Sequence, residues 1–116
     1  MKSEASEQSA LFEWAEYANN PELRLMFHIP NGGSRNIVEA VNLKKQGVKS
    51  GVPDILLPVA RKCYHGLFIE MKYGKNKISE NQTNWIINLS KQDYLCKVCY
   101  GFEEARKVIE NYLKGK

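Results

Sequence analysis

The sequence predicts an α/β or α+β domain in which a four-stranded mixed sheet is flanked by helices. Apolar residues recur at helical spacing in four segments, and short apolar runs typical of strands separate those segments. The expected order is helix, strand, helix, strand, strand, helix, strand, helix. The helix before the last strand allows a right-handed crossover within the sheet.

The N-terminal half is expected to contain two helices and one strand. The first helix begins at a capping Ser3 or Ser6 and ends near Asn20, before a proline. Its apolar stripe consists of Leu11, Trp14, Ala15 and Ala18. A strand is predicted over residues 23–29, because a Pro-Asn-Gly-Gly turn follows it. The second helix is predicted over residues 36–46, with a glycine as its stop.

The C-terminal half is expected to contain three strands and two helices. Apolar runs predict strands over residues 54–59 and 67–73, joined by a connection short enough for a hairpin. A helix capped by a serine is predicted over residues 79–91. A strand over residues 94–100 and a helix over residues 103–113 complete the chain.

Length and composition indicate one soluble domain over residues 1–116. Hydrophobic residues make up 43% and charged residues 26%, which is an ordinary globular balance. No apolar run approaches the roughly 20 residues of a membrane helix, and the polar N-terminus does not resemble a secretory signal. We therefore expect a cytoplasmic protein without a membrane partner. A formal net charge of +4 suits a polyanionic partner such as nucleic acid.

Three cysteines leave a zinc or redox function to be weighed. Cys96 and Cys99 have the C-x-x-C spacing, but they fall on a predicted strand, where positions i and i+3 face opposite sides. No second pair accompanies them, and Cys63 stands apart. Two buried strand cysteines are therefore preferred over a zinc or redox site.

The predicted strand over residues 67–73 carries an acid and an amine on one face. Glu70 and Lys72 are two residues apart, so both side chains point to the same side, while apolar neighbours alternate onto the other. Asp54 begins the preceding strand, and antiparallel pairing would bring it beside Glu70. An exposed strand face with a weak ion pair is the simpler alternative.

Two adjacent carboxylates form a hard-oxygen site that suits Mg²⁺ or Mn²⁺. Such an ion polarises a phosphodiester and lowers the pKa of a coordinated water. Lys72 beside the ion would orient the attacking water or neutralise developing negative charge. The sequence therefore predicts a metal-dependent phosphodiesterase with Asp54, Glu70 and Lys72 as its catalytic residues.

A family resemblance adds to this interpretation. Pro53-Asp54 followed by Glu70-Met71-Lys72 resembles the PD-(D/E)XK nuclease signature. Four motifs occur in order along the chain: His28-Ile29-Pro30-Asn31-Gly32-Gly33, Gly51-Val52-Pro53-Asp54, Leu67-Phe68-Ile69-Glu70-Met71-Lys72 and Ser79-Glu80-Asn81-Gln82. Together they resemble the virus-type replication-repair nuclease domain, VRR-NUC, over roughly residues 4–113.

The resemblance implies a restriction-endonuclease-like core and a divalent-metal nuclease acting on DNA. Asp54, Glu70 and the Met71 backbone carbonyl would bind the metal, and Lys72 would be the catalytic lysine. Stand-alone members resemble structure-selective endonucleases that act as homodimers on branched DNA. Holliday junctions are therefore the expected substrate, in DNA repair within a bacterial or phage-infected cell.

The family also carries an acidic residue and a glutamine on its first helix. Glu4 and Gln8 match that pattern, with Glu7 and Glu13 as competitors. At roughly 100° per residue, Glu4 points along the apolar stripe, Glu7 lies about 60° away and Glu13 falls on the opposite side. Glu4 is therefore preferred, then Glu7, and Glu13 is interpreted as solvated.

Further residues are candidates for supporting roles. Gln82 either belongs to the active site or closes an S-x-x-Q capping box with Ser79. Asn31 either serves its turn or approaches the site. The candidate phosphate contacts are Lys49, Lys75 and Lys77. The alternative function is a catalytically silent module that binds DNA junctions.

Overall fold

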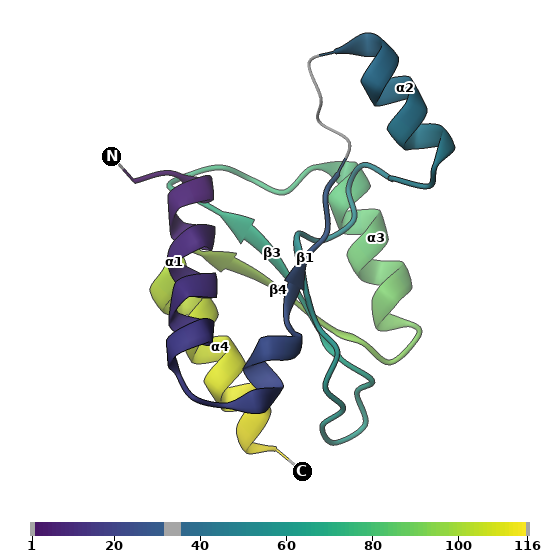
Figure 1. Cartoon of the computed structure of the whole chain (residues 1–116). Coiled ribbons are helices and arrows are strands. Elements are labelled where there is room, and N and C mark those ends of the chain that lie inside the picture. Colours follow the sequence, from purple (N-terminus) through teal and green to yellow (C-terminus); the bar gives the residue numbers. More distant parts are fainter. Residues whose placement is uncertain (1, 32–35, 116) are drawn as a thin grey trace.

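The computed structural model describes residues 2–31 and 36–115, and it places a four-stranded mixed sheet between helices (Figure 1). The strands are β1 (Phe27–His28), β2 (Ile55–Leu57), β3 (Leu67–Lys72) and β4 (Leu95–Tyr100). They lie in the order β1-β2-β3-β4; the first two pairings are antiparallel and the β3–β4 pairing is parallel. The predicted mixed sheet is thereby confirmed.

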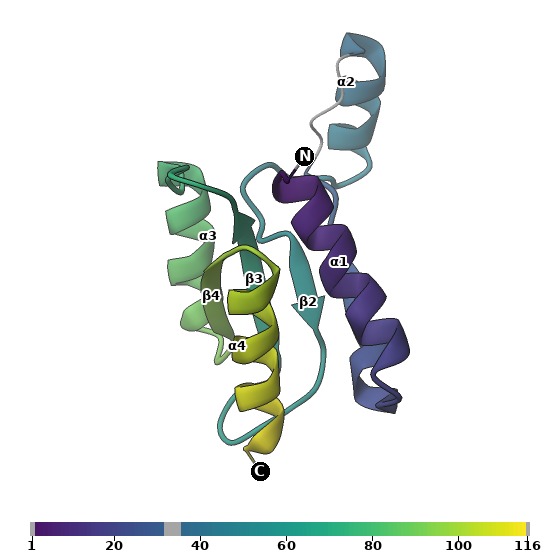
Figure 2. The same cartoon turned by 90° about the vertical axis from the view of Figure 1, so that its left-hand side faces the viewer.

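Helices cover both faces of this sheet. They are α1 (Glu4–Tyr17), α2 (Ile37–Lys45), α3 (Glu80–Ser90) and α4 (Phe102–Lys114), with a 3₁₀ helix η1 (Pro21–Leu25). Figure 2 shows α1 and α4 on one face of the sheet and α3 on the other. The crossover through α3 makes β4 parallel to β3.

The central strand β3 is buried along its whole length. All six of its residues are buried, because β2 and β4 flank it and helices cover its two faces. The core lies on the α1 and α4 side, where side chains of β2 and β3 meet the two helices. Its fully buried members include Leu11, Ile55, Leu67, Ile69 and Ile109. An acid and an amine on β3 are therefore held inside the protein rather than on a solvated face.

The expected strand over residues 23–29 is only partly correct. The structure has η1 at Pro21–Leu25 and a two-residue strand at Phe27–His28. Asn20 caps η1 by accepting a hydrogen bond from the Glu22 amide, and a proline occupies the first helical position. These local signals outweigh the apolar pattern that predicted an extended strand.

Helix α2 projects from the rest of the fold (Figure 1). Asn36 caps it by accepting a hydrogen bond from the Glu39 amide. None of its residues is buried, and Ile37, Val38 and Val41 are largely exposed. The apolar positions of this helix therefore do not join the core.

The two neighbouring cysteines of β4 differ in burial. Cys99 is fully buried and Cys96 is half-buried, whereas Cys63 is exposed. Burial raises the pKa of the Cys99 thiol to about 12 and also raises that of Cys96. These thiols are poor sources of the thiolate that zinc and redox chemistry need. Within the described residues, no helix has the length and apolar character to span a bilayer.

Candidate active site

The register of β2 and β3 brings Asp54 beside Glu70. Ile55 pairs with Ile69 in antiparallel register, so the preceding Asp54 lies opposite Glu70. Opposed residues of an antiparallel pair project to the same face of a sheet. Two acids that are far apart in the chain therefore share one place in the fold.

Hydrogen bonds to both its side chain and its backbone hold Asp54. The Met71 amide donates to Asp54 Oδ2 at 2.8 Å, and the Ile29 amide donates to the Asp54 carbonyl at 2.7 Å. Nδ1 of His28 lies 2.9 Å from the same carbonyl. Because a carbonyl only accepts, the Nδ1–H tautomer of His28 satisfies this contact. The carboxylate is thus anchored from β3 and its backbone from β1.

Glu70 is a buried acid with incomplete hydrogen bonding. It is 2% exposed, and Gln82 Nε2 donates to its Oε2 at 3.2 Å. Nζ of Lys72 lies 4.0 Å from the same oxygen. The other oxygen, Oε1, is buried, and no donor among the described residues reaches it. An unsatisfied buried carboxylate oxygen is costly and calls for a partner.

The surroundings of Glu70 disfavour its charged form. The pKa of Glu70 is raised from 4.5 to about 8, mainly by burial and then by the hydrogen bond and the charge of Asp54. Lys72 acts in the opposite direction, and Glu4 adds a small increase. The two carboxyl groups are therefore near enough to share a hydrogen bond when one of them is protonated.

The site has the donor chemistry that suits a hard divalent cation. Two carboxyl groups lie side by side, and one carries a buried oxygen without a protein donor. No cluster of three or more His, Cys, Asp or Glu side chains able to hold a metal occurs in residues 2–31 and 36–115. The pair therefore suits Mg²⁺, which binds through one or two carboxylates and retains several waters. Met71 contacts Asp54 through its amide, and its carbonyl as a ligand stays a prediction.

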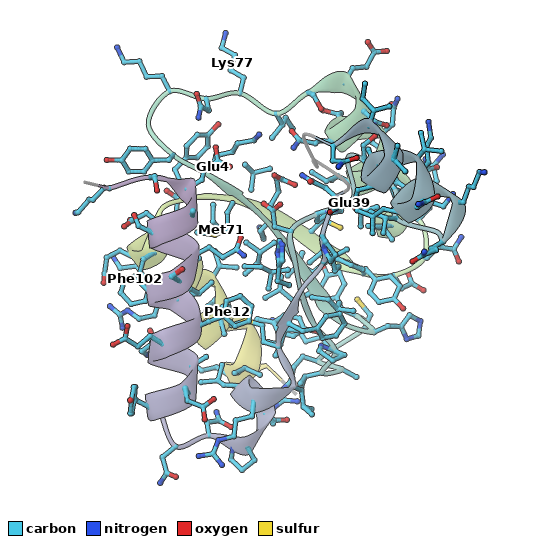
Figure 3. The ribbon with its side chains drawn as sticks, turned by 45° about the horizontal axis from the view of Figure 1, so that its top comes forward. Glu4, Phe12, Glu39, Met71, Lys77 and Phe102 are labelled. Atoms are coloured by element: carbon cyan, nitrogen blue, oxygen red, sulfur yellow. The ribbon has the colours of Figure 1, made fainter. Side chains whose placement is uncertain are left out.

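The first helix separates the roles of its two leading acids. Glu4 lies at the first turn of α1, near the segment that follows β3 (Figure 3), and Asn76 Nδ2 donates to its Oε2 at 3.2 Å. Glu7 instead accepts a hydrogen bond from the Phe102 amide at 3.1 Å, at the start of α4. Because Gly101 offers no side chain as a cap, Glu7 caps α4. Glu4 is thus the first-helix acid that faces Glu70.

Gln8 reaches the site indirectly. Its side-chain amide lies 3.0 Å from His28 Nδ1, the nitrogen that contacts the Asp54 carbonyl. Within residues 2–31 and 36–115, Gln8 forms no hydrogen bond with the Asp54 or Glu70 carboxyl group. His28 therefore supports the backbone of Asp54, and Gln8 lies beside its ring, because one Nδ1 cannot donate to the carbonyl and accept from Gln8 at the same time. His28 itself is exposed.

Gln82 serves as cap and as site residue at once. Its Oε1 accepts from the Ser79 amide at 2.8 Å, which closes the capping box of α3. Its Nε2 donates to Glu70. The two interpretations left open by the sequence are compatible, because the two ends of one amide perform them.

The next residue on α3 holds the loop that precedes Asp54. Asn81 Nδ2 donates to the Ser50 carbonyl at 3.0 Å and to its hydroxyl at 3.1 Å, and Trp85 Nε1 donates to the same carbonyl at 3.1 Å. Gly51 has φ +87°, and a Cβ there would lie 2.6 Å from the Asn81 amide nitrogen. The sequence motif contained Asn81, but only the fold reveals its partner.

The remaining predicted residues lie around this centre. Lys75 and Lys77 are exposed in the segment after β3, with Lys77 at its outer edge (Figure 3). Asn31 and Lys49 line a groove beside α3. Gly32 and Gly33 of the first motif lie outside the described residues.

Comparisons with known proteins identify the family and agree with the fold. The sequence model of the VRR-NUC domain matches residues 2–103. The chain belongs to the VRR-NUC family. A solved structure described as a VRR_NUC domain protein is similar to the chain, with a TM-score of 0.82 and 30% identity. The match covers 97% of this chain and 89% of that one.

Membership of the VRR-NUC family indicates a nuclease-type function in DNA processing, and therefore DNA binding. None of the proteins with curated descriptions matched. The structural similarity spans nearly the whole chain. The chain thus shares its four-stranded mixed sheet and flanking helices with a solved relative.

Proposed function

We propose that this VRR-NUC domain is a divalent-metal-dependent endonuclease that hydrolyses phosphodiester bonds in branched DNA, with Holliday junctions as the first substrate to test. One observation carries the proposal. Asp54 and Glu70 lie side by side, and Glu70 keeps a buried oxygen without a donor among the described residues, next to a buried Lys72. A structural ion pair does not need a second acid and an unsatisfied oxygen.

Each residue of this group has a distinct task in the proposed reaction. Asp54 and Glu70 would hold Mg²⁺ or Mn²⁺, with the Met71 carbonyl as a further ligand. A bound ion of this kind supplies Lewis-acid polarisation of the phosphodiester and of a coordinated water. The Met71 amide and Gln82 fix the orientation of the two carboxylates, so the ligands are already in place before a substrate arrives.

Lys72 completes the group. Its ammonium lies 4.0 Å from Glu70 Oε2 and is almost enclosed. In a site of low dielectric, a fixed cation stabilises negative charge that develops on the phosphoryl oxygens. The same ammonium can orient an attacking water by hydrogen bonding. Glu4 would act as a further acid at the edge of the site.

DNA affinity in this proposal comes from cations around the centre. Lys75 and Lys77 are exposed directly after β3, so they can reach phosphates on either side of the scissile bond. A homodimer would supply two active centres for the two strands cut at a four-way junction. A light-scattering mass near 13.3 kDa at working concentration would contradict the dimer.

Junction binding without cleavage is the second candidate. It is favoured by the presence of only two clustered acids, since no third ligating side chain joins them among the described residues. The retention of a buried acid and a buried amine at Glu70 and Lys72 argues against it, because a silent module gains nothing from the cost of burying them.

A cleavage panel separates the two candidates. Labelled duplex, nicked, flap, fork and four-way DNAs are incubated with Mg²⁺, with Mn²⁺ and with neither. Wild-type protein is expected to cut branched DNA only with metal, whereas Asp54→Ala and Glu70→Ala lose cleavage and retain binding. Glu16→Ala, a change at an exposed acid of α1, is the matched control. Normal cutting by Asp54→Ala and Glu70→Ala would refute the proposal, and junction binding without any cutting would establish the silent module.

A further inference from the structure

A groove of about 500 Å³ opens between α2, the loop before Asp54 and the N-terminal part of α3. Figure 1 shows α2 projecting above α3, with the loop that leads from α2 toward Asp54 between the two helices. The groove has the size of a site for a small organic group. Nothing in the proposed cation chemistry uses it.

The groove adjoins the candidate active site. One of its lining residues, Asn81, directly precedes Gln82, which donates to Glu70. Another, Ser50, lies four residues before Asp54, so their Cα atoms are at most about 14 Å apart. A nucleotide bound in the groove would therefore belong to the DNA within a few positions of the scissile phosphate.

The lining combines apolar surface with cations. Val41, Val48 and Trp85 supply apolar side chains, and Lys44 and Lys49 lie among them. Neither lysine forms an ion pair within residues 2–31 and 36–115. Paired duplex DNA presents its phosphates to a protein but keeps its bases stacked. Apolar walls beside cations instead suit an unstacked base with its own phosphates.

A hydrogen-bonding group is also available in the groove. Asn81 uses its Nδ2 to hold Ser50, and its carbonyl oxygen has no hydrogen-bond partner among the described residues. Trp85 Nε1 donates to the Ser50 backbone carbonyl, so its indole is held in place before any ligand binds. A rigid aromatic surface next to a free acceptor is typical of sites that bind nucleobases.

We propose that this groove binds an unpaired nucleotide of the DNA substrate beside the bond that is cut. The inference rests on the proposed function for the identity of the ligand as DNA. It assigns a physical reason for a preference for branched substrates, because a junction, flap or fork offers unpaired nucleotides that a duplex does not. Lys44 and Lys49 bind the flanking phosphates, and the apolar walls accept the base.

Two matched pairs of variants test the groove. Val41→Glu places a negative charge in it, whereas Val38→Glu places the same charge on the same helix at an exposed residue that does not line it. Lys44→Ala removes a lining cation, whereas Lys45→Ala removes its neighbour outside the lining. Circular dichroism checks that each variant folds.

The measurement is binding without metal, so that it does not depend on cleavage. Two DNAs of the same sequence are compared by fluorescence anisotropy, one fully paired and one with three unpaired nucleotides that include 2-aminopurine. Wild-type protein is expected to bind the second DNA about tenfold more tightly and to change the 2-aminopurine fluorescence. Val41→Glu and Lys44→Ala are expected to lose most of this preference, and Val38→Glu and Lys45→Ala to keep it.

Several outcomes would overturn the inference. An undiminished preference in Val41→Glu, or an equal loss in Val38→Glu, would show that the groove does not hold the nucleotide. A change of oligomeric mass in Val41→Glu would assign the groove to a contact between subunits. Loss of the proposed nuclease function has a different signature: no cutting in the DNA panel, with the binding preference and its dependence on Val41 intact.

Discussion

Replacing Glu70 with glutamine is expected to stabilise the metal-free protein at neutral and alkaline pH. Glu70 is buried beside Asp54, and its pKa rises from 4.5 to about 8. Below about pH 4.5 the folded and unfolded chains both carry the proton. As the pH rises toward 8, the folded chain retains a proton that the unfolded chain has lost, so the free energy of unfolding falls. Glu70→Gln removes this titration.

The size of the effect follows from the pKa. A rise from 4.5 to about 8 corresponds to a ceiling of about 5 kcal/mol, at ~1.4 kcal/mol for each pH unit. At pH 7 the same reasoning gives about 3 kcal/mol, from the 2.5 pH units above 4.5. The glutamine keeps the shape and an acceptor for Gln82. The melting temperature is therefore expected to rise by roughly 10 °C at pH 7 to 8.

The assay is thermal unfolding in EDTA from pH 4 to 9, followed by circular dichroism. The wild-type curve should fall below that of Glu70→Gln progressively between pH 4.5 and 8, and the difference should then level off. Glu16→Gln, at an exposed acid of α1, controls for the general loss of one carboxylate. Curves for wild type and Glu70→Gln that stay parallel over this range would refute the reasoning.

Mg²⁺ or Mn²⁺ should cancel most of this difference in stability at pH 7. A cation that binds only the folded chain stabilises it by about 2.7 kcal/mol at a concentration 100 times its Kd. The wild-type gain should increase with pH, because binding requires the ionised carboxylates. Glu70→Gln should gain little from either metal. An equal gain in both proteins would place the cation elsewhere.

Three further substitutions test the scaffold by chemical denaturation. Gly51→Ala should lower the free energy of unfolding by more than about 2 kcal/mol, because the new Cβ would lie 2.6 Å from the Asn81 side chain. Gly47→Ala is the control: its φ is +103° but the space around it is open, so it should cost only about 1 kcal/mol. Glu7→Ala should cost about 1 kcal/mol by removing the cap of α4; an unchanged midpoint would contradict that role. Tyr112→Phe should cost about 1 to 2 kcal/mol through its lost 2.6 Å hydrogen bond, while Tyr17→Phe at an exposed position should have no effect.

Much of the fold was predictable because its signals are local. The alternation along β3 and the capping serine of α3 are local patterns that the structure retains. The strand expected at residues 23–29 was wrong over its first part because Asn20 and Pro21 favour a 3₁₀ turn. Apolar content alone does not distinguish these two conformations in so short a segment.

The candidate site was predictable in part for a related reason. A two-residue spacing on a strand fixes that Glu70 and Lys72 share a face, and antiparallel pairing places Asp54 nearby. The supporting contacts were not accessible, since they join residues far apart in sequence. The hydrogen bond from Asn81 to Ser50 and that from the start of α4 to Glu7 depend on how helices dock.

The burial of Glu70 connects the stability of this fold with the proposed binding of a cation. Burial raises the pKa of Glu70 and also leaves its Oε1 without a donor among the described residues. Both observations mean that negative charge on this carboxylate is poorly stabilised by the protein. A protein donor at that oxygen would stabilise the chain and would also compete with a cation for it. Selection for stability alone would therefore remove this acid, and under the proposed function its retention sacrifices stability for the ability to bind a positive charge.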